Sequence, residues 1–187
     1  MSQPHTILVF AASNSHTSIN RRLALHAARV LHDELAVKVD IDALDLNDFE
    51  IPLYSSQREE EGGIPQLAHD FYNRIAAADG LIVSYAVHNG HYTAAFKNIF
   101  DWCSRIDKKV FQNKPKVALA TSPGKGGGAS VLKAVLDSAS HFGADIKGSL
   151  SVPSFSENFD VQTEQLCNPV LAQELRTALL QLQSALI

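Results

Sequence analysis

The sequence between Thr6 and Leu35 is TILVFAASNSHTSINRRLALHAARVLHDEL, and it combines three kinds of segment. The first, Thr6–Ala11, is a short and continuous apolar run, as expected for a central parallel strand that is covered on both faces. A polar loop follows. The apolar residues then recur at helical spacing, which predicts an amphipathic helix over Ser18–Leu35 with a buried face made of Ile19, Leu23, Ala27, Val30 and Leu31. The stretch therefore predicts the strand, loop and helix that open an α/β protein.

The same alternation continues along the chain. Further strands are predicted at Val37–Leu46, Gly80–Tyr85, Lys116–Thr121 and Asp145–Val152. Further helices are predicted at Ile64–Ala78, at Thr93–Arg105, at Ala129–Phe142 with Gly143 as its stop, and from Asn168-Pro169 towards Leu186. Asn47–Gly63 is expected to be a long loop. Five strands that alternate with helices predict a doubly wound parallel sheet in a three-layer sandwich, as one domain over residues 1–187.

The composition argues against several classes of protein. Of 187 residues, 45% are hydrophobic and 19% are charged, which is typical of a globular rather than a disordered chain. The net charge of −4 leaves no basic excess for a nucleic-acid partner. No apolar run approaches the roughly 20 residues that span a bilayer, and Met1–Thr6 lacks the basic residues of a signal peptide. Cys103 and Cys167 form no CxxC pattern and are expected to be buried thiols in a reducing cytoplasm.

Polar or glycine-rich loops follow three of the predicted strands, at the sheet edge where such folds bind ligands. They are ASNSHTSIN over 12–20, AVHNGHY over 86–92 and SPGKGGG over 122–128. The first loop leads into a helix, whose free N–H groups and dipole favour an anion. It also carries four hydroxyls, whereas a helix cap needs only one. The loop therefore favours a bound phosphate monoester over a simple cap, with donors from Ser13, Ser15, Thr17, Ser18 and Asn20.

The residue types argue against the common alternatives for such a loop. A P-loop would need Ser or Thr after Gly124-Lys125, and a dinucleotide fingerprint would need glycines where Ala12-Ser13-Asn14 stands. A low-molecular-weight phosphatase would need a cysteine in the first loop, and a receiver domain would need acidic residues after the first and third strands. A phosphate loop with two further loops that flank a flat ring describes a mononucleotide site, for which FMN is the natural ligand. Flexible connecting loops remain the alternative.

With these motifs the chain resembles the NAD(P)H-dependent FMN reductase family of flavodoxin-like quinone, azo and chromate reductases. The family's phosphate loop, Gly-Ser-x-Arg-x-x-Ser-x-Asn, is matched at Ser13, Ser18 and Asn20. Its Pro-x-Tyr motif is matched at 52–54 and its Ala-Asp-Gly motif at 78–80. Its Asn-Gly pair and its Lys-Asn-x-x-Asp-Trp motif are matched at 89–90 and 97–102. The resemblance spans about Thr6–Phe155, and the run Asn89–Trp102 is its most specific part.

The resemblance implies a flavodoxin-like fold with FMN as cofactor and NADPH or NADH as co-substrate. It also implies ping-pong transfer of electrons to a small acceptor, such as a quinone, an azo compound, free flavin or a metal oxyanion. The active species would be a homodimer or homotetramer, with no membrane or nucleic-acid partner. No catalytic side chain and no metal ligand is assigned. The residues expected to bind FMN are Ser13, Ser15, Ser18, Ile19, Asn20, Ala86, Val87, His88, Asn89, Gly90, Ser122, Gly126 and Gly127.

The chain departs from the family pattern at three places. Ser15 replaces the phosphate-loop Arg, Ala12 replaces the Gly, and Ala86-Val87-His88 replaces Pro-Glu-Tyr. Neutral donors would then hold the phosphate, which weakens its binding. Two alternatives therefore stay open: an electron carrier that binds flavin without turning over NAD(P)H, and a scaffold without flavin. Other side chains are given plain interpretations: His88 and His91 as surface polar residues, Trp102 and Phe100 as core or interface residues, Lys125 as an exposed cation, and Glu59–Glu61 as a solvated loop.

Overall fold

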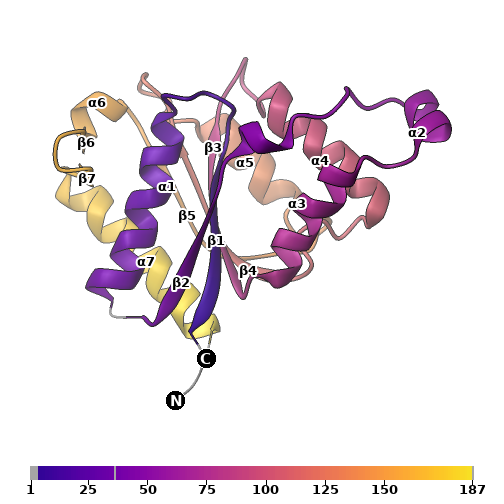
Figure 1. Cartoon of the computed structure of the whole chain (residues 1–187). Coiled ribbons are helices and arrows are strands. Elements are labelled where there is room, and N and C mark those ends of the chain that lie inside the picture. The colour runs from indigo at the N-terminus through magenta and orange to yellow at the C-terminus, as the bar shows by residue number, and fades with distance from the viewer. Residues whose placement is uncertain (1–3, 36, 187) are drawn as a thin grey trace.

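The computed structural model describes residues 4–35 and 37–186, so part of the Met1–Thr6 segment lies outside the described residues. Its centre is a parallel sheet of five strands in the order β2-β1-β3-β4-β5, with helices on both faces (Figure 1). This confirms the predicted doubly wound sheet. The strands are β1 (His5–Ala12), β2 (Val39–Leu44), β3 (Gly80–Ala86), β4 (Lys114–Thr121) and β5 (Ala144–Val152). In the described residues, no helix is both long enough and apolar enough to cross a membrane.

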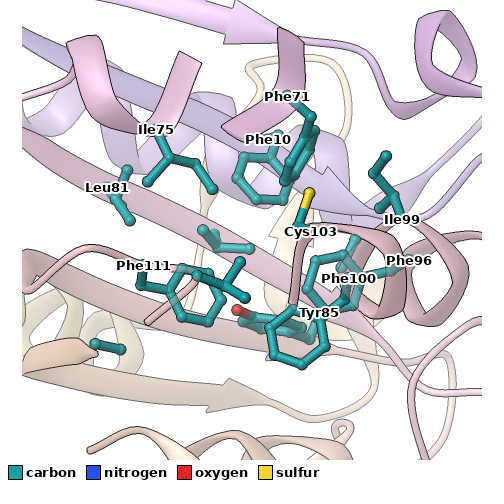
Figure 2. Packing of buried hydrophobic residues seen from close by; sticks show 14 of the residues in the cluster. Phe10, Phe71, Ile75, Leu81, Tyr85, Phe96, Ile99, Phe100, Cys103 and Phe111 are labelled. Atoms are coloured by element: carbon teal, nitrogen blue, oxygen red, sulfur yellow. The ribbon is translucent and has the colours of Figure 1, made fainter. Parts of the chain in front are cut away.

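Each face of the sheet has its own hydrophobic core. On one face α1 (Ile19–Arg29) and α7 (Pro169–Ala185) cover the sheet through Leu23, Leu179 and other aliphatic residues. On the other face lie α3 (Gln66–Ala77), α4 (Ala94–Ile106) and α5 (Ala129–Ser138). Aromatic rings dominate this second core (Figure 2), where Phe10 meets Phe71 edge-on with 5.5 Å between ring centroids. Trp102 and Phe100 are buried in it, as the core interpretation predicts.

Three predicted helix starts are confirmed together with their caps. Ser18 and Thr93 accept hydrogen bonds from backbone N–H groups three residues later, Arg21 N and Phe96 N. Asn168 caps α7 by accepting from two N–H groups, and Pro169 occupies the first turn, where its missing N–H costs nothing. These caps fix where the helices behind the ligand-binding edge begin.

The segment Asn47–Gly63 is not the long loop that its polarity predicts. It contains a 3-10 turn (Leu46–Phe49) and the helix α2 (Ser56–Gly62), capped by Ser55. Nothing in α2 is buried, so it lacks the apolar periodicity by which helices are predicted from sequence. The helix projects away from the body of the protein on an extended arm (Figure 1). Glu59–Glu61 is therefore helical, and Glu59 forms an ion pair with Arg105 at 2.9 Å.

Smaller corrections concern the ends of other elements. Helix α5 ends at Ser138 rather than Phe142, because the turn that follows is tied to its neighbours by bonds from Asn113 N to Gly143 O (2.7 Å) and from Ala144 N to Ala139 O (2.8 Å). A π-helical turn (Val30–Glu34) ends the first helix. After β5 the chain forms α6 (Phe155–Asn158) and a hairpin of β6 (Phe159–Asp160) and β7 (Gln165–Leu166), which the sequence interpretation missed. Cys103 is buried as expected, but Cys167, beside this hairpin, is exposed.

His26 fastens this hairpin to α1. Its Nε2 accepts a hydrogen bond from Leu166 N at 3.4 Å, and its ring packs edge-on against Phe159 with 5.8 Å between centroids. Burial, and after it the charge of Arg29, lowers the pKa of His26 from 6.5 to about 4. The folded protein therefore keeps this imidazole neutral in conditions where the unfolded chain protonates it.

Acidification should destabilise the fold through His26. As the pH falls from 6.5 to about 4, the unfolded chain binds a proton that the folded chain does not, so the free energy of unfolding falls by up to about 3 kcal/mol. Urea unfolding across this pH range would measure it. His26→Gln is the control, because its amide can still accept from Leu166 N without titrating. An equal acid-induced loss in both proteins would contradict the role given to His26.

Lys116 is fully buried in the aromatic core. Its Nζ lies 2.6 Å from the hydroxyl of Tyr85 and 3.5 Å from the ring centroid of Phe111. Burial lowers the pKa of Lys116 well below its usual range and raises that of Tyr85 well above its own. Burial thus disfavours the charged form of both groups in the folded protein, whereas the unfolded chain exposes both to water.

We expect the double substitution Lys116→Met with Tyr85→Phe to stabilise the protein by about 1–3 kcal/mol near pH 7, because it removes an amine and a hydroxyl that must be desolvated when the chain folds. The gain should shrink as the pH rises towards 10.5, where the unfolded chain also loses the proton. Tyr85→Phe alone should destabilise, since it leaves the amine without a partner. Thermal unfolding of the wild type, the double variant and Tyr85→Phe measures these changes in stability. A double variant that is less stable than the wild type would contradict the prediction.

Candidate functional site

The first loop forms one wall of a pocket at the carboxyl edge of the sheet. Ser13 directly follows β1, and its Oγ accepts a hydrogen bond from Ser15 N at 3.2 Å, which bends the chain towards α1. Ser15 and Thr17 are exposed, with their hydroxyl oxygens 3.5 Å apart. Ser18 uses its side chain as the helix cap. The first-turn N–H groups of α1 have no acceptor within the helix, so the loop presents hydroxyl and amide donors on the same side.

Asn20 ties the start of α1 to two strands of this edge, β3 and β4. It is 2% exposed, and its Oδ1 accepts from Ser84 Oγ at 2.8 Å and from Thr121 N at 3.1 Å. Its Nδ2 donates to Thr121 O at 3.1 Å. These bonds join the start of α1 to β3 and β4 and leave one amide N–H for anything else. Asn20 is thus mainly a brace of the site, although the sequence places it among the ligand-binding residues.

The pocket has a volume of about 250 Å³ and gathers residues from all three loops. The ends of β1, β3 and β4 are in register, with Ala12 beside Tyr85 and Ala86 beside Thr121, and this alignment brings the loops together. Nine predicted site residues line the pocket: Ser13, Ser15, Ser18, Ile19, Asn20, Ala86, Val87, His88 and Ser122. The lining is completed by Thr17, Thr121 and Pro123. Thr121 and Pro123 were missed as site residues, although their place at the end of β4 could have indicated them.

Asn89 and Gly90 do not line the pocket but form an exposed turn beside it. His88 N donates to His91 O at 2.9 Å, and His91 N donates to His88 O at 3.1 Å. Between them Asn89 and Gly90 have φ values of 50° and 86°, the positive pair that a type I′ turn requires. This two-residue hairpin directly follows Ala86-Val87-His88, the residues that stand where the family has Pro-Glu-Tyr. It holds the backbone of 86–88 against the pocket.

Gly126 and Gly127 also lie outside the pocket lining, for different reasons. Gly127 has φ of 57°, and a Cβ there would lie 2.6 Å from Ser151 Oγ and 2.8 Å from Pro153 N. Its glycine is required for packing against the end of β5. A Cβ on Gly126 would meet nothing within 4 Å. The third loop is also fastened to the chain after β5, where Ser154 N donates to Gly124 O at 3.0 Å.

No Lys, Arg, Asp or Glu is among the residues that line the pocket, within the described part of the chain. The two arginines that follow in α1 are engaged elsewhere. Arg21 pairs with Asp45 at 3.0 Å, and Arg22 pairs with Glu164. Hydroxyls and backbone amides of the first loop suit the oxygens of a phosphate, and the loops after β3 and β4 form the rest of the lining. The fold is that of a flavodoxin-like protein, and the pocket is a candidate mononucleotide site.

Comparison with known proteins agrees with this class. The model of the NADPH-dependent FMN reductase family matches residues 5–157, and the chain belongs to this family. An NADPH:quinone oxidoreductase of Arabidopsis thaliana is 30% identical over 66% of this chain and 61% of its own length. A quinone reductase of Escherichia coli K12 is 29% identical over 54% of each chain. The matched regions thus cover 61% and 54% of the length of these two relatives.

Solved structures show the same fold across the whole chain. A flavoenzyme NAD(P)H:acceptor oxidoreductase from Paracoccus denitrificans superposes with a TM-score of 0.72, at 20% identity and 97% coverage of both chains. The azoreductase AzrA superposes with a TM-score of 0.63, at 17% identity and 97% coverage of both. The predicted flavodoxin-like fold is confirmed, and FMN with a nicotinamide co-substrate is the chemistry of the family.

Proposed function

We propose that the protein is an FMN-dependent NAD(P)H oxidoreductase that passes electrons to a small acceptor, such as a quinone, an azo compound, free flavin or a metal oxyanion. The observation that carries the proposal is the single pocket at the ends of β1, β3 and β4, which collects nine of the predicted cofactor-binding residues. Family membership supports the same chemistry. We place the reaction in the cytoplasm, where thiols such as Cys103 and Cys167 stay reduced.

The chain contributes binding and orientation rather than a reacting side chain. FMN, when bound, supplies the hydride chemistry. Ser15, Thr17 and the N–H groups that open α1 would hold its phosphate, and the backbone of 86–88 would flank its ring together with Ser122. The turn of Asn89 and Gly90, and the packing of Gly127, would keep these walls in place. We propose that the nicotinamide and the acceptor use the same face of the bound flavin in turn, so that the nicotinamide leaves before the acceptor enters, a ping-pong order.

The first test is a visible spectrum of the purified protein after incubation with FMN and desalting. A retained flavin band that bleaches under anaerobic NADPH supports the reductase. A retained band that does not bleach indicates an electron carrier, and no retained band contradicts the proposal. Val87→Trp should abolish retention by filling the pocket, whereas Val161→Trp, at an exposed position outside it, should not.

We also propose that the protein assembles as a homodimer, or a pair of such dimers, through the α2 arm. The α2 arm consists of α2 and the residues from Pro52 that lead into it. Hydrogen bonds hold the arm in place, although nothing in α2 is buried. Trp102 Nε1 donates to Pro52 O at 2.8 Å, Asn98 Oδ1 accepts from Tyr54 N at 2.9 Å, and the adjacent Leu53 is 66% exposed. A rigid arm that presents an apolar side chain suits a second copy. Sedimentation equilibrium tests this directly, since the chain has a mass of 20.3 kDa.

A further inference from the structure

Two histidines stand opposite each other at the base of the exposed turn beside the pocket. His88 and His91 form an antiparallel bridge, in which His88 N donates to His91 O at 2.9 Å and His91 N donates to His88 O at 3.1 Å. Residues that exchange both backbone bonds in this way have Cα atoms about 5.5 Å apart, and their side chains leave the pair on the same face. The two imidazoles are therefore close enough to bind one small ligand together.

The turn between the two histidines fixes this arrangement. Asn89 and Gly90, with φ of 50° and 86°, close the hairpin with two residues. Just after the hairpin the chain is anchored to the end of β1, where Thr93 Oγ1 donates to Ala12 O at 3.0 Å. Folding has thus already brought the two imidazoles together, and a ligand that bridges them restricts little further conformational freedom.

The ring nitrogens of both histidines are available to a ligand. Both residues are exposed, and within the described part of the chain their rings form no hydrogen bond or ion pair. The ring of His91 meets that of Tyr92 edge-on, with 4.7 Å between centroids. His26 and His32 differ, because each uses a ring nitrogen in a contact with another residue, at 3.4 and 2.7 Å. The bridged pair is thus open to binding where these two are engaged.

We propose that His88 and His91 together bind one divalent transition-metal ion at the rim of the pocket. Neutral imidazole binds Zn²⁺, Ni²⁺ and Cu²⁺ through a ring nitrogen, and the affinity is highest for Cu²⁺. His88 also lines the pocket, so the ion would lie at its mouth. In the described residues no third His, Cys, Asp or Glu completes a metal-binding group, which leaves the other coordination positions to water. The site requires no bound flavin and stands apart from the proposed function.

Titration of the flavin-free protein with Cu²⁺ tests the site, at about pH 7.5, where free histidine is largely neutral. Excess glycine in the buffer competes for the ion and suppresses binding by single ligands. We expect one Cu²⁺ per chain, with an electron paramagnetic resonance spectrum that shows two imidazole nitrogens. Ni²⁺ and Zn²⁺ should bind more weakly, and Mg²⁺, which prefers oxygen ligands, should not compete.

Histidine variants decide whether the two imidazoles act together. His88→Gln and His91→Gln should each weaken Cu²⁺ binding by at least about tenfold, because each removes one of the two protein ligands. His16→Gln and His141→Gln, at exposed positions elsewhere, are the matched controls and should bind as the wild type does. Failure to bind Cu²⁺, or wild-type affinity in either His88→Gln or His91→Gln, would overturn the proposal. A protein that binds Cu²⁺ in this way but retains no FMN would keep this site and lose the proposed function.

Discussion

Replacing Asn20 with alanine should lower the free energy of unfolding by about 3 kcal/mol and abolish flavin retention. The substitution leaves Ser84 Oγ and both backbone groups of Thr121 without their partner in a buried place, and each unsatisfied buried group costs about 1–3 kcal/mol. Partial solvation of the cavity offsets some of this cost. The start of α1 then loses its attachment to β3 and β4, and the phosphate-binding wall moves relative to the ring-binding wall. Urea unfolding and a desalted FMN spectrum measure the two effects.

Asn14→Ala is the matched control for Asn20→Ala. It removes the same amide from the same loop, but Asn14 is exposed and its side chain makes no hydrogen bond to the described residues. We expect it to change stability by less than about 0.5 kcal/mol. Ser84→Ala removes only one of the three bonds and should cost about 1 kcal/mol. If Asn20→Ala were no more harmful than Asn14→Ala, the brace would have no role in holding the pocket.

Replacing Trp102 with alanine should cost about 3–5 kcal/mol and release the α2 arm. The side chain is 1% exposed, so its loss opens a large cavity in the aromatic core. It also removes the bond from Trp102 Nε1 to Pro52 O and the edge-on contact with Tyr54, whose ring centroid is 5.0 Å away. Because the arm is the proposed dimer contact, the protein should also become monomeric. Thermal unfolding and sedimentation equilibrium report the two consequences separately.

Trp102→Phe separates the packing of the side chain from its hydrogen bond. It keeps most of the buried ring and loses only the donor to Pro52 O, so it should cost about 1–2 kcal/mol and leave the dimer intact. If the Trp102→Ala protein unfolds no more easily than the Trp102→Phe protein, the core must collapse around the missing ring. A stable Trp102→Ala dimer would remove the arm from the proposed interface.

The sequence predicts the fold because its strongest pattern, the spacing of apolar residues, is set by the buried faces of the strands and helices. Continuous apolar runs such as Thr6–Ala11 are typical of a strand that is covered on both faces, and the alternation of such runs with amphipathic helices admits few topologies. Capping residues such as Asn168 then locate helix starts within a residue. The pocket follows from the same logic, since the loops after β1, β3 and β4 must meet where the strands end in register.

The elements that the sequence could not predict have no periodic pattern of apolar residues. Helix α2 buries nothing, and β6 and β7 have two residues each, too few for any period. The turn at Asn89-Gly90 was different, because this dipeptide is the strongest short-range hairpin signal and could have been recognised. The dual use of Asn20 could not, since the partners of a buried amide are set by tertiary contacts 64 and 101 residues away.

The sharing of one core by α1 and α7 has a consequence for how the chain folds during synthesis. Leu23 and Ala27 of α1 are made early, whereas Leu179 and Leu182 of α7, which belong to the same core, are made about 150 residues later. Until α7 leaves the ribosome, this apolar layer stays open while the aromatic layer around α3, α4 and α5 can already close. A nascent chain halted before α7 would therefore expose an apolar surface, and we expect chaperones to bind this surface.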